Sequence, residues 1–139
     1  MKSASSRPEP VITPEFASWW DAVRRHALEI QRCGHCRAWI HYPRVLCPHC
    51  FSDELAFEPV NGSGHVVTWS VVHLAQHPDF ADEVPYAVVV AEMAEGFRLL
   101  ANVSGIELDE LRTGMPVCVS FCDFANGVTL PVFVFDPTA

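Results

Sequence analysis

The chain has 139 residues, of which 50% are hydrophobic and 19% charged, so it can bury a core and is not intrinsically disordered. Its formal net charge of −8 at pH 7 argues against a general nucleic-acid-binding protein. No apolar run approaches the length of a membrane-spanning helix, and no apolar stretch follows Lys2 as in a secretory signal. We therefore expect a cytoplasmic protein that binds no membrane, with its six cysteines as metal ligands or free thiols.

Charge is distributed unevenly along the chain. Residues 24–50 carry five arginines and one acidic residue, whereas residues 51–139 carry two arginines and 13 acidic residues. A slightly basic front module is thus joined to a strongly acidic back module. A binding site for an anion is expected on the front module or at the junction.

The first 28 residues divide into two predicted segments. Residues 1–12 are rich in Ser and Pro and are predicted to form a flexible tail. Residues 13–28 are predicted to form a helical arm, with Thr13 as N-cap and Pro14 in the first turn. The apolar side chains of this arm recur at helical spacing and form a stripe of Phe16, Trp20, Val23 and Ala27, widened by Trp19.

Two interpretations of that stripe stay open. It packs on its own domain, or it contacts a partner protein through Phe16, Trp19 and Trp20. The second interpretation is supported by the enrichment of large aromatic side chains at protein interfaces, and by the small local core that such a short helix has to cover.

Two C-x-x-C motifs carry the strongest chemical signal: Cys33-Gly34-His35-Cys36 and Cys47-Pro48-His49-Cys50. A tight turn between two cysteines lets both thiolates face one ion, and two such turns supply four sulfurs at tetrahedral corners. This arrangement suits Zn²⁺, while iron in a rubredoxin-like site uses the same ligands. We predict a ribbon over residues 29–60 whose structural metal is bound by Cys33, Cys36, Cys47 and Cys50, with the two histidines as bystanders.

Residues 61–139 are predicted to form a five-stranded OB-fold barrel. β-branched and aromatic residues alternate with turn signals, of which Asn126-Gly127 is the strongest. A short helical stretch over 106–111 separates the third strand from the fourth, which is the order of an OB-fold. The predicted strands are 65–73, 86–93, 97–103, 116–124 and 128–135.

We predict no catalytic residue in this chain. Cys118 and Cys122 lie in one predicted strand and are interpreted as packing thiols, since no base accompanies them in the sequence. His73, His77 and Asp79 are interpreted as surface residues of a polar loop, because the cluster has no defined orienting partner.

The chain resembles the zinc-ribbon OB-fold family long described as domain of unknown function 35, which is associated with acyl-CoA metabolism. The resemblance extends over about residues 13–135 and follows an ordered set of short motifs. They are the helix with Phe16 and Trp20, Gln31–Cys36, Tyr42-Pro43-Arg44, Cys47–Cys50, Gly64, Thr68–His73, His77–Phe80, Val84-Pro85-Tyr86 and Leu111–Val117.

This resemblance implies a function as well as a fold. Family members partner thiolase-like enzymes: ketothiolases, acyltransferases, lipid-transfer-type thiolases and steroid side-chain retro-aldolases. The expected role is a non-catalytic accessory subunit that helps to form the acyl-CoA site of such a partner. Coenzyme A is an anion, so Arg32, Arg37 and Arg44 are candidate contacts for it or for an acidic partner surface.

A free-standing nucleic-acid-binding protein is the alternative, because zinc ribbons and OB-folds are common in that class. Such a barrel needs basic residues along its strands and exposed aromatic rings for stacking. The acidic residues 51–139 argue against it, and we expect acyl-CoA and a catalytic subunit rather than nucleic acid as partners.

Overall fold

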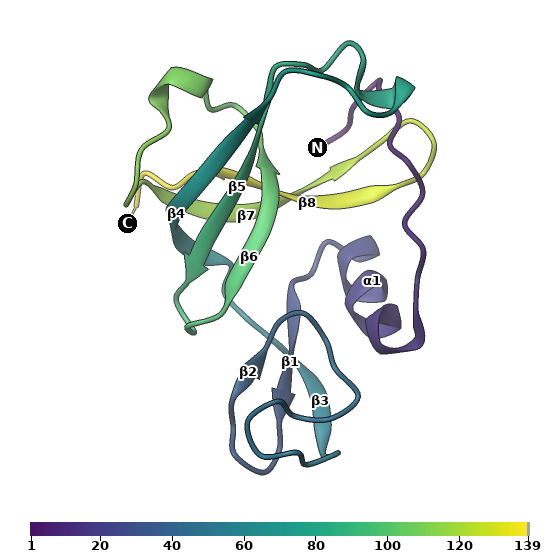
Figure 1. Cartoon of the computed structure of the whole chain (residues 1–139), viewed down its shortest axis with the longest axis vertical. Helices are drawn as coiled ribbons and strands as arrows, with labels where there is room; N and C mark the ends of the chain where they lie inside the picture. The colour runs from purple at the N-terminus through teal and green to yellow at the C-terminus, as the bar shows by residue number, and fades with distance from the viewer. Residues whose placement is uncertain (139) are drawn as a thin grey trace.

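The ribbon and the barrel lie at opposite ends of the molecule, with helix α1 beside their junction (Figure 1). The computed structural model of the chain describes residues 1–138. It confirms the predicted fold class: mainly β, with an N-terminal helix, a four-cysteine ribbon and a closed five-stranded barrel. Within the described part of the chain, no helix is long and apolar enough to span a bilayer.

The ribbon is a three-stranded antiparallel sheet in the order β2-β1-β3. Its strands are β1 (Glu29–Cys33), β2 (Trp39–Ile40) and β3 (Leu55–Pro59). The buried core that belongs to this sheet consists of Cys33, Ile40 and Cys47. Because so small a core stabilises little, we expect a metal bound by the four cysteines to supply much of the folding free energy of the ribbon.

The barrel closes in the strand order β4-β5-β6-β8-β7, and among these five strands the one parallel pair joins β6 to β8. This connectivity is that of an OB-fold. The 3₁₀ turn η3 (Leu108–Glu110) lies between β6 and β7, where a short helical stretch was expected. The strands agree with the predicted ranges within two residues at each end: β4 (Ser63–Val72), β5 (Tyr86–Met93), β6 (Arg98–Val103), β7 (Pro116–Asp123) and β8 (Thr129–Phe135).

Gly64 allows β4 to pair with two neighbouring strands at the same position. It lies opposite Met93 of β5 and opposite Val117 of β7. A Cβ atom at this position would stand 2.6 Å from the Glu92 carbonyl oxygen and 2.8 Å from the Met93 sulfur. Only glycine fits where the three strands meet this closely, so the closure of the barrel depends on this residue.

Helix α1 (Ala17–Arg24) follows the 3₁₀ turn η1 (Pro14–Phe16). The turn η1 begins at Thr13, whose carbonyl accepts a 3.0 Å hydrogen bond from the Phe16 N–H. Thr13 occupies the predicted N-cap position and Pro14 follows it, but the Thr13 side chain makes no capping hydrogen bond in the described structure. The helix ends before His26, whose φ of 58° turns the chain towards β1.

The apolar face of α1 is centred on Trp19 rather than on Trp20. Trp19 and Val23 belong to the main core, together with residues of the barrel, whereas Phe16 and Trp20 are half-buried. Trp19 is only 7% exposed, so its predicted place on a partner surface is corrected. The helix covers the junction of ribbon and barrel, and the residue that points into that junction becomes core.

Residues 1–12 were predicted to form a flexible tail, but the first seven of them pack against the barrel. Lys2 forms a parallel bridge with Asp123 at the end of β7, and Arg7 is buried. The sequence of this segment is polar, but the end of β7 offers it unpaired backbone groups.

Candidate metal centre and its surroundings

Four cysteine sulfurs converge at the tip of the ribbon. The Cys33 and Cys50 sulfurs are 3.6 Å apart, as are those of Cys36 and Cys47, and all four lie within 4.8 Å of one another. Four sulfurs at about 2.3 Å from one Zn²⁺ stand about 3.8 Å apart at the corners of a tetrahedron. The cluster therefore fits one tetrahedral metal ion with no fifth ligand position, as the spacing of the motifs predicted.

The backbone of each C-x-x-C turn supports its first cysteine. The N–H groups of His35 and Cys36 each donate to the Cys33 sulfur at 3.4 Å, and the His49 N–H donates to the Cys47 sulfur at the same distance. Hydrogen bonds of this kind stabilise a thiolate. The side chains of His35 and His49 are exposed and stand outside the sulfur cluster.

Both turns close with a residue in the left-handed conformation. Arg37 has a φ of 63° and donates its N–H to the Cys33 carbonyl, and Phe51 has a φ of 62° and donates to the Cys47 carbonyl. Inside the first turn, the Gly34 N–H donates to the Glu54 carbonyl at 2.6 Å. The two motifs are thus matching turns, and the second leaves the Phe51 ring 75% exposed.

Two of the thiols have shifted pKa values in opposite directions. The N–H of Cys36, followed by that of His35, lowers the pKa of Cys33 to about 6 against the effect of burial. The pKa of Cys50 is raised to about 12: the Ser52 N–H lowers it, but burial and the neighbouring thiols together outweigh that effect. Metal binding must displace protons from such a cluster, so the affinity for metal falls as the pH falls.

The three arginines predicted to contact an anion differ in whether their guanidinium groups are already paired with a carboxylate. The Arg32 guanidinium stacks 4.3 Å above the Trp39 ring, and both Arg32 and Arg37 share the Glu58 carboxylate, at 3.7 and 3.4 Å. Arg44 is held only by its backbone, through two hydrogen bonds with the Gln31 amide at 2.8 and 2.9 Å. Its exposed side chain forms no ion pair with any of residues 1–138.

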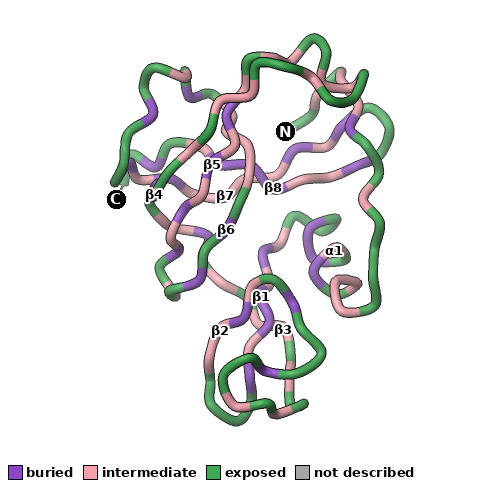
Figure 2. The backbone as a smooth tube through the Cα atoms, in the orientation of Figure 1, coloured by how far each residue is buried: buried purple, intermediate pink, exposed green. Residues whose placement is uncertain are grey.

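The loop between β2 and β3, which carries Arg44, exposes a set of apolar side chains. They are Tyr42, Val45, Leu46 and Phe51, which are 48%, 75%, 48% and 75% exposed. The Tyr42 ring also lies 6.2 Å from the ring of Phe16, which links the patch to the helical arm. The loop between β2 and β3 is correspondingly exposed along most of its length (Figure 2). We call these four residues the ribbon patch.

Sequence reasoning did not single out the ribbon patch as functional. Its residues flank the second metal-binding turn, where no strand or helix is predicted that could bury them. Apolar residues in a segment without predicted secondary structure are therefore the sequence signal by which the ribbon patch could have been recognised.

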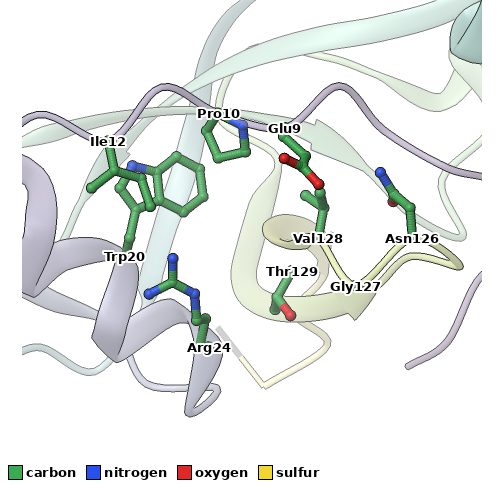
Figure 3. A pocket seen from close by; sticks show the side chains of 9 residues that line it. All are labelled: Glu9, Pro10, Ile12, Trp20, Arg24, Asn126, Gly127, Val128 and Thr129. Atoms are coloured by element: carbon green, nitrogen blue, oxygen red, sulfur yellow. The ribbon is translucent and has the colours of Figure 1, made fainter.

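Two cavities adjoin the helical arm. An apolar cavity of about 320 Å³ lies between α1 and strands β5, β6 and β8, lined among others by Trp19, Trp20 and Tyr86. A second cavity of about 200 Å³ separates Trp20 and Arg24 from the β7–β8 turn at Asn126–Thr129, with Glu9, Pro10 and Ile12 above it (Figure 3). Trp20 lines both, so its half-buried ring is their common wall.

The end of the arm is pinned to β7 through Asp123. Hydrogen bonds from His26 at 2.9 Å and from the Thr129 hydroxyl at 2.7 Å lower the pKa of the Asp123 carboxyl. The His26 ring stacks on Phe121 with centroids 5.4 Å apart. These contacts place the arm beside the barrel but assemble no nucleophile.

The remaining candidate reactive groups are the thiols of Cys118 and Cys122 and the His77–Asp79 pair. Burial raises the pKa of Cys118 and of Cys122, so both thiols are protonated at neutral pH. Cys122 packs in a small cluster with Phe124 and Val132, on the face of β7 opposite to Val117 in the main core. In the polar loop, the His77 ring accepts the Asp79 N–H at 3.1 Å and so caps η2 (Pro78–Phe80).

These features define a class: a four-cysteine ribbon followed by an OB barrel, with a helical arm covering the junction. Residues 20–56 match the family described as the rubredoxin-like zinc ribbon domain of ChsH2, and residues 57–121 match the C-terminal OB-fold domain of ChsH2. The chain therefore belongs to the ChsH2 family of DUF35 zinc-ribbon OB-fold proteins, as the resemblance in its motifs implied.

Three similar proteins carry names that describe roles. The chain is 39% identical, over 95% of its length, to a probable enoyl-CoA hydratase alpha subunit of Thermomonospora curvata, and covers 41% of that protein. It is 33% identical, over 72% of its length, to a DUF35 domain-containing scaffold protein of Methanocaldococcus jannaschii, of which it covers 71%. It is 30% identical, over 84% of its length, to the 3-oxo-4,17-pregnadiene-20-carboxyl-CoA hydratase alpha subunit of Mycobacterium tuberculosis, of which it covers 37%.

The chain thus spans about two fifths of the length of the two hydratase subunits. Among solved structures it is similar to a chain of an "Ltp2-ChsH2(DUF35) aldolase", with a TM-score of 0.82 and 38% identity. That match covers 90% of this chain and 97% of the other.

Proposed function

We propose that this chain is a non-catalytic accessory subunit of an acyl-CoA-processing enzyme complex. In this proposal it binds a thiolase-like catalytic subunit and helps to form the acyl-CoA site of that partner. The names of its relatives support the proposal, since they include a scaffold protein, alpha subunits of hydratases acting on CoA esters, and an aldolase complex. Zn²⁺ would be its structural metal, held in a reducing compartment such as the cytoplasm.

The ribbon patch is the observation that carries the proposal. Apolar side chains as exposed as Val45 and Phe51 are costly to leave in water, and the metal-bound turn holds them in a fixed arrangement. A rigid apolar patch loses little conformational entropy when it is covered, so it is suited to a stable interface. Phe16 continues this surface onto the helical arm, since its ring lies 6.2 Å from that of Tyr42, whereas Trp20 is half-buried between the arm and the barrel.

The chemistry of the chain supports a non-catalytic role. Four thiolates complete the coordination of a metal and leave no position for water or substrate. The two remaining thiols are protonated at neutral pH, because burial raises the pKa of each, and the nearby Asp136 carboxylate raises the pKa of Cys118 further. The reacting groups would then come from the partner subunit.

Arg44 is the best candidate in this chain for a contact with coenzyme A. Its guanidinium is exposed and free of carboxylates, while its backbone is fixed by the Gln31 amide. A phosphate of coenzyme A could accept two hydrogen bonds from it. Arg32 and Arg37 would first have to be released from Glu58, so we assign them a supporting role.

Co-expression with thiolase-like proteins encoded by the same genome tests the proposal. We expect one of them to form a stable complex with this chain in size-exclusion chromatography, and its activity or solubility to rise. Phe51→Ser should weaken that complex by about tenfold or more, because it removes the burial of one aromatic side chain. Leu74→Ser is the matched control, since Leu74 is equally exposed at 72% but lies in the β4–β5 loop.

Two results would contradict the proposal. One is turnover of an acyl-CoA by the intact chain alone. The other is a complex that Phe51→Ser and Leu74→Ser weaken equally, which would remove the ribbon patch from the interface. Zinc content measured for each variant separates a lost interface from a lost ribbon.

A further inference from the structure

The first residues of the chain extend the barrel by a short parallel strand. The Asp123 N–H donates to the Met1 carbonyl, and the Asp123 carbonyl accepts the Ser3 N–H, both at 2.9 Å. Two residues further on, the Ala125 N–H donates to the Ser5 carbonyl at 2.9 Å. Bonds to residues 1, 3 and 5 follow the two-residue period of a strand, along the free edge at the end of β7.

Arg7 continues the same period and anchors the strand. Its backbone N–H donates to the Asn126 side-chain oxygen at 3.3 Å, and its carbonyl accepts from the Asn126 side-chain nitrogen at 2.7 Å. The amide of Asn126 thus pairs with Arg7 as a backbone strand would. The arginine itself is only 8% exposed, which is rare for this residue type unless a site is built for it.

The guanidinium of Arg7 occupies such a site. It lies between two aromatic rings, 4.7 Å from the centroid of Phe80 and 4.3 Å from that of Phe124, with the Glu83 carboxylate at 3.7 Å. Its Nη1 also donates to the Ser6 carbonyl at 3.0 Å. Two ring faces, a carboxylate and an amide together select a planar cation on an extended backbone.

The walls of this site come from the two loops that flank the ligand face of OB barrels. Phe80 and Glu83 belong to the loop between β4 and β5, and Phe124 and Asn126 to the turn between β7 and β8. In nucleic-acid-binding OB-folds, these loops and the strands between them contact the ligand. Here Arg7 covers both aromatic faces on which a base could stack.

We propose that this edge of the barrel is a peptide-binding site that takes an extended, arginine-bearing segment by parallel β-addition, and that residues 1–7 occupy it in cis. Main-chain hydrogen bonds supply affinity and the arginine pocket supplies specificity, as in other cases of β-strand addition. The acidic character of residues 51–139 favours a cationic segment over any other. This inference stands independently of the proposed function.

Amide hydrogen exchange of the full chain tests the site. In Arg7→Ala, the Ala125 amide should exchange about tenfold faster or more, because the aromatic and ionic contacts that hold the strand are lost. Arg7→Lys should fall between that variant and the wild type, since lysine keeps the charge but not the planar group. Lys2→Ala is the matched control and should leave Ala125 protected, because the Lys2 side chain is exposed.

Rescue in trans separates a binding site from simple loss of stability. An acetylated peptide of residues 1–8, added in excess to the Arg7→Ala chain, should restore protection of Ala125, and the same peptide with alanine at Arg7 should not. Equal effects of the two peptides, or unchanged protection in Arg7→Ala, would overturn the proposal. Wild-type protection that rises with protein concentration would show that the segment of a second copy fills the site, and would overturn the assignment in cis.

Discussion

His41 makes the junction of arm, ribbon and barrel sensitive to acid. Its ring packs against Trp19 of the arm, with centroids 6.0 Å apart, and against Phe97 of the barrel at 6.1 Å. Burial lowers the pKa of His41 from 6.5 to about 4. The folded state therefore requires neutral imidazole down to a pH at which the unfolded chain is already protonated.

The sign and size of the effect follow from this difference in pKa. Between pH 6.5 and pH 4 the unfolded state binds a proton that the folded state excludes, so the free energy of unfolding falls as the pH falls through this window. From pH 7 to pH 5 the loss amounts to about 1.8 kcal/mol. Above about pH 8 the group contributes almost no pH dependence, because it is neutral in both states.

Denaturant unfolding of the wild type and of His41→Phe, each at several pH values, measures this contribution. Phenylalanine keeps the ring packing and does not titrate, while metal release and all other ionisations affect both proteins alike. We expect the stability of the wild type relative to the variant to fall by about 1.8 kcal/mol between pH 7 and pH 5. A stability difference that does not change with pH would refute the reasoning.

Three further predictions concern the metal, the barrel and nucleic acid. Purified protein should contain one metal ion per chain, and Cys36→Ser should lose it and unfold the ribbon while circular dichroism still shows the barrel; absence of metal from protein prepared without chelator would disprove the metal site. Gly64→Ala should lower the free energy of unfolding by about 2–3 kcal/mol in denaturant titrations, because its Cβ would overlap the Glu92 carbonyl, whereas His65→Ala at the exposed neighbouring position should change it by about 0.5 kcal/mol at most. Single-stranded DNA or RNA should bind only feebly at physiological salt in a fluorescence titration, since residues 51–139 are acidic, and a sub-micromolar, salt-sensitive complex would reverse that conclusion.

The metal site and the strand order could be predicted because their signals are local. A C-x-x-C turn brings its two sulfurs together by its own backbone geometry, and the pair of turns leaves few other uses for four cysteines. The barrel strands were found within two residues because each alternates or clusters β-forming residues between recognisable turns. Five strands with a short interruption after the third then restrict the topology to very few closed forms.

In the helical arm, the local sequence pattern does not decide which tryptophan is buried. The sequence places Trp20 in the apolar stripe of the predicted helix and Trp19 beside it, as a residue that widens the stripe. Only the packing of α1 against ribbon and barrel decides that Trp19 is core and that Trp20 is half-buried. Which side of a helix faces inward depends on the angle at which it docks, and that angle is set by distant residues.

The sequence by itself thus determined the metal ligands, the ribbon and the five-stranded barrel, because each rests on spacing or periodicity within a short stretch. Only the tertiary structure decided the burial of Arg7 and the exposure of the ribbon patch. A polar segment such as residues 1–7 has no periodicity that predicts order; it is ordered because the free edge of β7 and two aromatic rings from separate loops meet there. Conversely, Val45 and Phe51 are apolar but remain exposed, because their loop folds around the four cysteine sulfurs rather than against the barrel core. Burial is a property of what surrounds a residue in space, and those neighbours come from parts of the chain that no local pattern connects.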